Sequence, residues 1–245
     1  MRFFVRQKNG KQGNTLCISC FSFCVDGEKD KLSSRRRFIQ SFLRGCDSTM
    51  PTIIWCGNQP WDTDFPESVL PNRAKAIDMP ADIFKSSMAY GMLPLVLCGA
   101  IIAAKWLILQ EREINSVYVP IGILLGLLLM PVHELLHALC YEKGQKVYIG
   151  ISLKKFAAFA VCHEPISKRR FVVMSLMPVL LGVVPFVVFL LAPPNGILSG
   201  ICIPLGVMGV LSPMPDYMAV SIVCRQVPPK AYVHTQNHGF YWYNP

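Results

Sequence analysis

The chain has 245 residues, of which 52% are hydrophobic and 16% are charged, and its formal net charge is +9 at pH 7. Soluble domains carry about a quarter charged residues, so this composition excludes an ordinary soluble protein and favours a membrane protein. The positive charge does not indicate nucleic-acid binding, because most basic residues lie in the N-terminal segment and in one later loop, without any DNA- or RNA-binding motif.

Residues 1–86 are expected to form a basic, largely irregular N-terminal extension that leads into the membrane. Residues 1–49 are typical of an unstructured cytosolic tail. In the lead-in that follows, Trp55 and Trp61 are candidate anchors at the membrane interface. The sequence leaves open whether translation starts at Met1 or at Met50.

Ten cysteines are scattered along the chain. Several of them stand in apolar segments, where cysteine acts as a small hydrophobic residue. A C-x-x-C-x-x-x-C cluster comprises Cys17, Cys20 and Cys24. A lone cluster without a second pair of ligands is weak evidence for a metal site, and no disulfide framework is indicated.

Four apolar segments follow the extension, and each is long enough for an α-helix to cross about 30 Å of hydrocarbon. They predict an all-α membrane domain over residues 87–224, followed by a C-terminal tail, residues 225–245. Several prolines in the last segment predict a broken helix there. The segments are residues 88–109, 117–140, 171–192 and 197–223.

The distribution of basic residues predicts the orientation of these spans. Of the 24 Lys and Arg residues, 13 precede the first span, 7 lie between the second and third, and 2 follow the fourth. Only Lys105, placed to reach the interface with its long side chain, and Arg112 fall on the other side. The positive-inside rule therefore predicts that both termini are cytosolic.

The loop between the second and third spans, residues 141–170, is rich in β-branched and aromatic residues. Residues 146–153 and 156–163, with two lysines between them, predict a short β-hairpin. The same loop could instead lie along the lipid surface as an amphipathic stretch held by its basic side chains. The sequence does not choose between these two structures.

The second span ends in His133-Glu134-Leu135-Leu136-His137, an H-E-x-x-H motif. Positions i and i+4 share one face of a helix, so both imidazoles can bind one Zn²⁺, and Glu134 is a candidate general base for a water on that metal. The alternative is a helix end at which these residues only meet the interface. The uncharged stretch before the motif, residues 117–132, favours the metal site, because ionisable groups in membrane spans are costly.

Catalytic zinc sites generally use three protein ligands and a water, so a third ligand is required. No charged residue occurs from Phe171 to Pro215, and Asp216 follows. Asp216 lies 19 residues into its span, and His133 and His137 lie 16 and 20 residues into theirs, which places all three at a similar depth. Asp216 is therefore the predicted third ligand. Other candidates are His163, which ranks next, Glu164, His234 and His238.

Taken together, these residues resemble a family of multi-span membrane proteins known as putative zincin peptidases. The resemblance covers roughly residues 88–224. It rests on the H-E-L-L-H-A sequence of residues 133–138, on the C-H-E-P-I-S sequence of residues 162–167, and on Asp216. More distantly, the chain is similar to the site-2-protease group of intramembrane metalloproteases, in which an H-E-x-x-H motif pairs with an aspartate on a later span. The resemblance implies a zinc peptidase by analogy.

The sequence therefore predicts a zinc-dependent, membrane-embedded endopeptidase. His133, His137 and Asp216 would hold Zn²⁺, and Glu134 would activate a water to cleave membrane or membrane-proximal proteins. The edge of the predicted hairpin could hold such a substrate as an added strand. The expected partners are a membrane-protein or peptide substrate and the lipid bilayer. The alternative is a membrane scaffold or regulator that retains the zinc site without proteolysis.

Overall fold

We describe the protein from a computed structural model, which covers residues 50–60, 63, 65–66, 68–109, 114–154, 157–236 and 239–245. The predicted tail over residues 1–49, the C-x-x-C cluster within it, Trp61 and His238 lie outside the described residues. The division of the chain at residues 86 and 224 stays a prediction.

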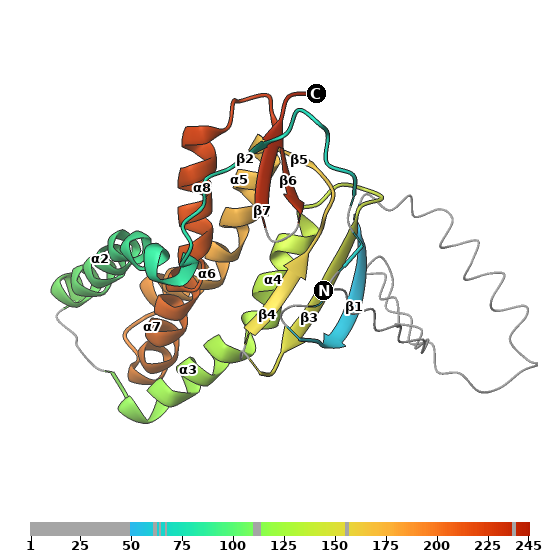
Figure 1. The fold of residues 1–245 in the computed structure, drawn as a ribbon. Helices are drawn as coiled ribbons and strands as arrows, with labels where there is room; N and C mark the ends of the chain where they lie inside the picture. The colour runs from blue at the N-terminus through green and yellow to red at the C-terminus, as the bar shows by residue number, and fades with distance from the viewer. Residues whose placement is uncertain are drawn as a thin grey trace, which may run out of the picture.

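Four helical segments within the described residues are long and apolar enough to cross a membrane, in agreement with the four apolar helices that the sequence predicts. The first span is a single helix, and the other three are each divided into shorter helices (Figure 1). In chain order they are α2 (Ile83–Leu109); η1 (Ser116–Tyr118), α3 (Val119–Leu128) and α4 (Met130–Leu139); α5 (Lys168–Leu176), η2 (Met177–Val179) and α6 (Leu180–Leu191); and α7 (Gly196–Leu211) and α8 (Met214–Gln226).

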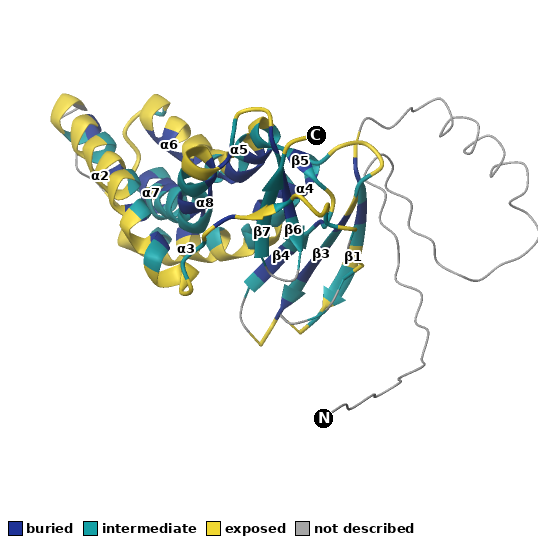
Figure 2. Ribbon diagram, turned by 45° about the horizontal axis from the view of Figure 1, so that its top comes forward, coloured by how far each residue is buried: buried dark blue, intermediate teal, exposed yellow. Residues whose placement is uncertain are grey.

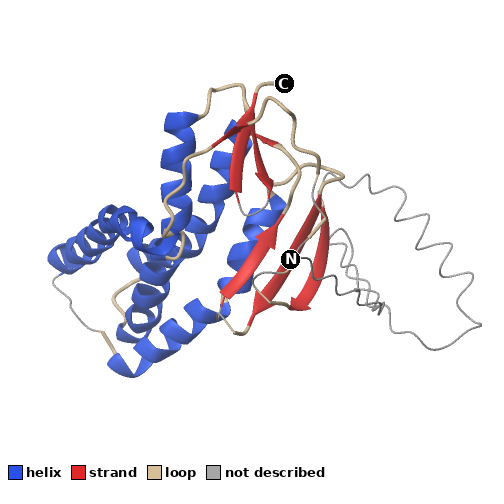
Figure 3. Ribbon diagram, viewed as in Figure 1, coloured by secondary structure: helices blue, strands red, loops and turns tan. Residues whose placement is uncertain are grey.

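The prediction of an all-α fold is wrong in part, because the described residues also form two small sheets beside the helices (Figure 3). In the first sheet β3 lies between a parallel β1 and an antiparallel β4, so the predicted hairpin is confirmed as β3–β4. The second sheet is antiparallel, in the order β2-β7-β6-β5. The strands are β1 (Thr52–Asn58), β2 (Lys75–Ala76), β3 (Lys146–Ser152), β4 (Ala157–Val161), β5 (Ile166–Ser167), β6 (Tyr232–Gln236) and β7 (Gly239–Tyr243).

The strand pairings bring three distant parts of the chain to one end of the helices. β1 precedes the first span and pairs with β3, which follows the second span. β6 and β7 follow the fourth span, and they pair with β5 and β2 respectively. The lead-in, which was expected to be irregular, and the C-terminal tail therefore both contribute strands to a cap over that end.

Two apolar clusters attach this cap to the helices. In the first sheet Ile53, Val147 and Ile149 pack on Ala138 of α4. The second sheet packs on α5 and α8 through a larger cluster that includes Phe171 and Val223. The two sheets of the cap thus pack against α4 and α8, which are the second halves of the second and fourth spans.

Within the spans, glycines let the backbones approach closely, as is common in membrane helix packing. A Cβ atom on Gly209 of α7 would lie 2.4 Å from the backbone nitrogen of Gly182, at the contact with α6. A Cβ atom on Gly122 of α3 would lie 2.5 Å from the carbonyl oxygen of Ile201. α7 therefore packs tightly between α3 and α6, whereas α2 is largely exposed (Figure 2).

Lys105, expected to reach the membrane interface, is instead buried and only 7% exposed. Its ammonium group donates hydrogen bonds to the carbonyl oxygens of Phe189 and Ala192 and lies 4.3 Å from the centroid of the Phe189 ring. These carbonyls stand at the C-terminal end of α6, where a cation is favourable. Lys105 thus joins α2 to the end of α6.

Candidate metal centre

The second and fourth spans both break immediately before their predicted ligands. α4 starts again with Pro131 in its first turn and carries His133 there. α8 starts after Pro213, with Pro215 in its first turn and Asp216 one residue later. Proline is well suited to the first turn of a helix, where no intrahelical partner for its missing N–H is needed.

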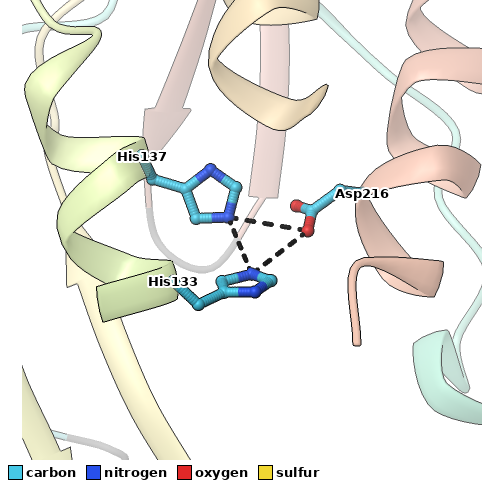
Figure 4. A group of neighbouring side chains, drawn as sticks. All are labelled: His133, His137 and Asp216. Carbon is cyan, nitrogen blue, oxygen red and sulfur yellow. Dashed lines mark hydrogen bonds and ion pairs between the residues drawn. The ribbon is translucent and has the colours of Figure 1, made fainter. Parts of the chain in front are cut away.

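The three predicted ligands converge in space (Figure 4). The Nε2 atoms of His133 and His137 lie 3.2 Å apart. Each of them lies 3.5 Å from Oδ2 of Asp216. The histidine side chains are 6% and 11% exposed, and that of Asp216 is 23% exposed. The centre is therefore mostly enclosed but open on the side of Asp216.

Hydrogen bonds behind the rings orient both histidines. Nδ1–H of His137 donates to the carbonyl oxygen of Met174 at 2.9 Å. Nδ1 of His133 lies 3.3 Å from Oγ of Ser212, and that hydroxyl in turn lies 3.4 Å from the carbonyl oxygen of Gly209. Since the Ser212 hydroxyl donates its single proton to Gly209, it accepts from Nδ1–H of His133. Both Nε2 atoms then present lone pairs to the centre, as metal-ligating histidines do.

The residues fit a tetrahedral zinc ion. Three lone-pair atoms that face one another repel unless a proton or a metal cation lies between them. Zinc bonds of about 2.0–2.1 Å in a tetrahedron place neighbouring ligand atoms about 3.3 Å apart. The observed separations of 3.2 and 3.5 Å agree with that value. Three protein ligands would leave the fourth position for a water or a substrate.

Glu134 stands beside the centre rather than in it. Its carboxylate accepts a hydrogen bond from the backbone N–H of Ala160 on β4 and lies near His133, His137 and Asp216. Consecutive residues of a helix point about 100° apart, so the residue after His133 cannot share the face that His133 and His137 present. This position suits a general base better than a ligand.

The other candidate ligands are engaged elsewhere. Nδ1 of His163 bonds the carbonyl oxygen of Thr235 at 2.8 Å. Nε2 of His234 lies 3.2 Å from Oγ of Ser68, which also donates to the carbonyl oxygen of His163. Glu164 is exposed in the loop before β5. Within the described residues, the group of side chains spaced for a metal contains Asp216 and none of these three.

Two titratable side chains next to the spans stay neutral at neutral pH. Burial raises the pKa of Tyr141 far above its ordinary value. Burial also raises the pKa of the Cys162 thiol to about 11. Cys162 also stands outside the group of side chains that are spaced for a metal.

Sequence reasoning missed the groups that hold the histidines. Ser212 stands one turn before Asp216, and a hydroxyl in an otherwise uncharged span was a signal that could have identified it. The Met174 contact uses a backbone carbonyl, which carries no residue-specific signal. The site thus depends on three spans, because α5 supplies this carbonyl in addition to the ligands on α4 and α8.

Comparison with known proteins bears on this site directly. A family model described as Putative zincin peptidase matches residues 126–232. The resemblance to this family is thereby confirmed over these residues. The matched segment contains the H-E-x-x-H motif, the β3–β4 hairpin and Asp216, and the family implies zinc as the metal. No curated protein and no solved structure matched the chain.

Proposed function

We propose that this protein is a zinc-dependent, membrane-embedded endopeptidase that cleaves membrane or membrane-proximal segments of other proteins. The observation that carries the proposal is the convergence of Nε2 of His133, Nε2 of His137 and Oδ2 of Asp216 at tetrahedral spacing. The zincin match and the four apolar helices support the peptidase class and the membrane location.

Bound by His133, His137 and Asp216, Zn²⁺ would supply the Lewis acidity that activates a water and polarises a peptide carbonyl. Glu134 accepts the proton of the attacking water and passes it to the leaving amine. Asp216 stands in the first turn of α8, and the dipole of that helix stabilises the negative charge that develops at the centre.

β4 provides a place for the substrate backbone. In the described sheet it pairs with β3 on one side only, so its other edge is available for an added strand. Ala160 on this strand contacts Glu134. A peptide extended along β4 therefore runs past the general base and beside the metal ligands.

We also propose that the end of the helices that carries both sheets faces the cytosol. Of the 24 basic residues, 22 lie in segments on that side of the spans, counted as 13 before the first span, 7 between the second and third and 2 after the fourth. The active site then lies near the cytosolic leaflet, and both termini are cytosolic.

Substitution of Glu134 by Gln tests the mechanism. Glu134→Gln removes the proton acceptor and keeps the metal ligands, so zinc content should stay near wild type while cleavage falls by ~10²-fold or more. The measurement pairs metal analysis of the purified protein with cleavage of a panel of co-expressed single-span membrane proteins.

The matched control is Glu142→Gln, which changes an exposed carboxylate that pairs with Arg170 outside the centre. It should leave both zinc content and cleavage near wild type. Full cleavage by Glu134→Gln would overturn the proposed mechanism. Absence of cleavage in the wild type with zinc retained would favour the alternative, a zinc-binding scaffold or regulator.

A further inference from the structure

A cavity of about 200 Å³ opens directly beside the metal centre. Two of the ligands, His137 and Asp216, form part of its wall. The rest of the wall comes from β4, α5, α8, the second sheet and the residues Tyr141, Cys162 and Glu164, so the C-terminal hairpin β6–β7 forms part of it. Its apolar lining includes Val161, Phe171, Met174, Ala219, Val233 and Phe240.

The size and lining of the cavity suit a bulky apolar group. An engineered apolar cavity of about 150 Å³ binds benzene, so this one has room for an aromatic ring or a branched aliphatic chain. Tyr141 and Cys162, which also line it, are neutral, and Ser175 and Thr235 contribute only hydroxyl groups. Apart from Asp216 at the metal end, the charged lining residue is Glu164, which is exposed. An anionic group in such a cavity would lose its hydration and face the carboxylates of Asp216 and Glu164, and a cationic group could reach a carboxylate away from the metal only at the exposed Glu164.

The cavity lies beside the proposed path of the substrate peptide. Its wall contains Ala160 and Val161, which belong to the strand along which the substrate backbone is proposed to lie. It also contains two metal ligands, so a carbonyl held at the centre lies at the end of the cavity that these ligands form. The side chain next to that carbonyl then projects either into the cavity or directly away from it, because side chains alternate along an extended peptide.

We infer that this cavity receives the side chain of a substrate residue next to the scissile bond and selects leucine, methionine or phenylalanine there. The inference rests on the proposed function, because the metal centre has to bind the carbonyl. It goes beyond that function by naming the residue class that the site prefers and the walls that set the preference.

Two hydroxamates test the inference without any substrate, because a hydroxamate chelates zinc and carries one side group. The probes are acetohydroxamate, with a methyl group, and 3-phenylpropanohydroxamate, with a phenyl group on a short chain. Burial of a phenylalanine-sized group should make the second probe roughly 10- to 100-fold tighter. The measurement is calorimetric titration of the zinc-loaded Glu134→Gln protein in detergent.

Filling the cavity should abolish this difference. Ala219→Phe places a ring in the cavity from α8, and Thr235→Phe fills it from β6, where a strand accommodates an aromatic residue well. Either variant should bring the two affinities within about 3-fold of each other, while the affinity for acetohydroxamate stays at the wild-type value. The matched control is Val220→Phe, next to Ala219 on α8 but outside the cavity lining, and it should retain the preference.

The outcomes separate the two proposals. Equal affinities for both probes in the unfilled protein would overturn the cavity inference and leave the metal centre intact. Thermal melting shows which of the two filled variants is folded. If a folded variant still binds the phenyl probe more tightly than acetohydroxamate, the cavity inference is also overturned. Failure of the metal-loaded protein to bind either hydroxamate would instead contradict the proposed metal function.

Discussion

The first and fourth spans both contain proline, yet only the fourth is broken. α2 carries Pro94 and continues as one helix of 27 residues. The fourth span stops at Leu211, and α8 begins at Met214. The fourth span has two prolines two residues apart at its break, Pro213 and Pro215, whereas α2 has the single Pro94, and the surroundings of the two spans differ as well.

In the fourth span, side chains satisfy the carbonyl groups that the break exposes. The Ser212 hydroxyl donates to the carbonyl oxygen of Gly209, the group that an N–H at position 213 would otherwise reach. The Tyr217 hydroxyl donates to the carbonyl oxygen of Val210 at 2.8 Å. Non-helical backbone is tolerated in a membrane where protein groups satisfy it, and the enclosed fourth span provides them. The break thus presents Asp216 at the start of a new helix, whereas the exposed α2 carries no ligand of the centre.

The largest expected difference between the two spans is in the loss of stability when a glycine is replaced by a large residue. Gly209→Leu would force a side chain against the backbone of Gly182, 2.4 Å from its nitrogen, so it should destabilise the fold by about 3 kcal/mol or more. Gly99→Leu on α2 is the matched change, because nothing lies within 4 Å of a Cβ atom there. Thermal melting of the purified variants makes the comparison. Equal stability would show that α7 is not packed as described.

The next effect concerns metal affinity at the break. Ser212→Ala removes the acceptor for Nδ1–H of His133, and loss of such an orienting group typically lowers metal affinity 10–100-fold. Ser212→Thr keeps the hydroxyl and should restore most of the affinity. Competition with a chromogenic chelator gives the zinc affinity of each protein. If Ser212→Ala binds zinc as tightly as the wild type, Ser212 does not position the ligand.

The smallest effect concerns the second hydroxyl at the break. Tyr217→Phe leaves the carbonyl of Val210 without its donor and should cost about 1 kcal/mol of stability. Tyr90→Phe, the same change on α2, should be nearly neutral. Denaturation in mixed detergent can resolve the difference. A more destabilising Tyr90→Phe would contradict the proposed role of side chains in supporting the break.

The features predicted from the sequence are those that depend on local pattern. Hydropathy and helical rise located the four apolar helices, and segments rich in β-branched and aromatic residues indicated the hairpin as one of two possible structures. Counting residues from the start of each span placed Asp216 at the same depth as the two histidines. In the structure, the ligand atoms of the three residues lie within 4.8 Å of one another. Their roles as metal ligands stay predictions.

Features that depend on distant partners could not be predicted in the same way. β1 forms because Thr52–Asn58 finds β3 almost a hundred residues later, and the all-α prediction missed this pairing. Lys105 is a charged residue near the end of a span, which is typical of the membrane interface. It is buried because its ammonium group bonds to the carbonyl oxygen of Ala192 at the end of α6. In the sequence, Pro131 is the one residue that indicates the break before α4. The same proline is compatible with a helix that continues without a break.

We expect the two broken spans to hold one metal ion together, and metal analysis of the purified protein measures this. The proteins to compare, purified in detergent without chelators, are the wild type, Asp216→Ala and His163→Ala. We predict about one Zn²⁺ per chain in the wild type and in His163→Ala, and almost none in Asp216→Ala, because two protein ligands hold zinc poorly. A folded wild type free of zinc, or an Asp216→Ala protein that keeps its zinc while His163→Ala loses it, would contradict the account.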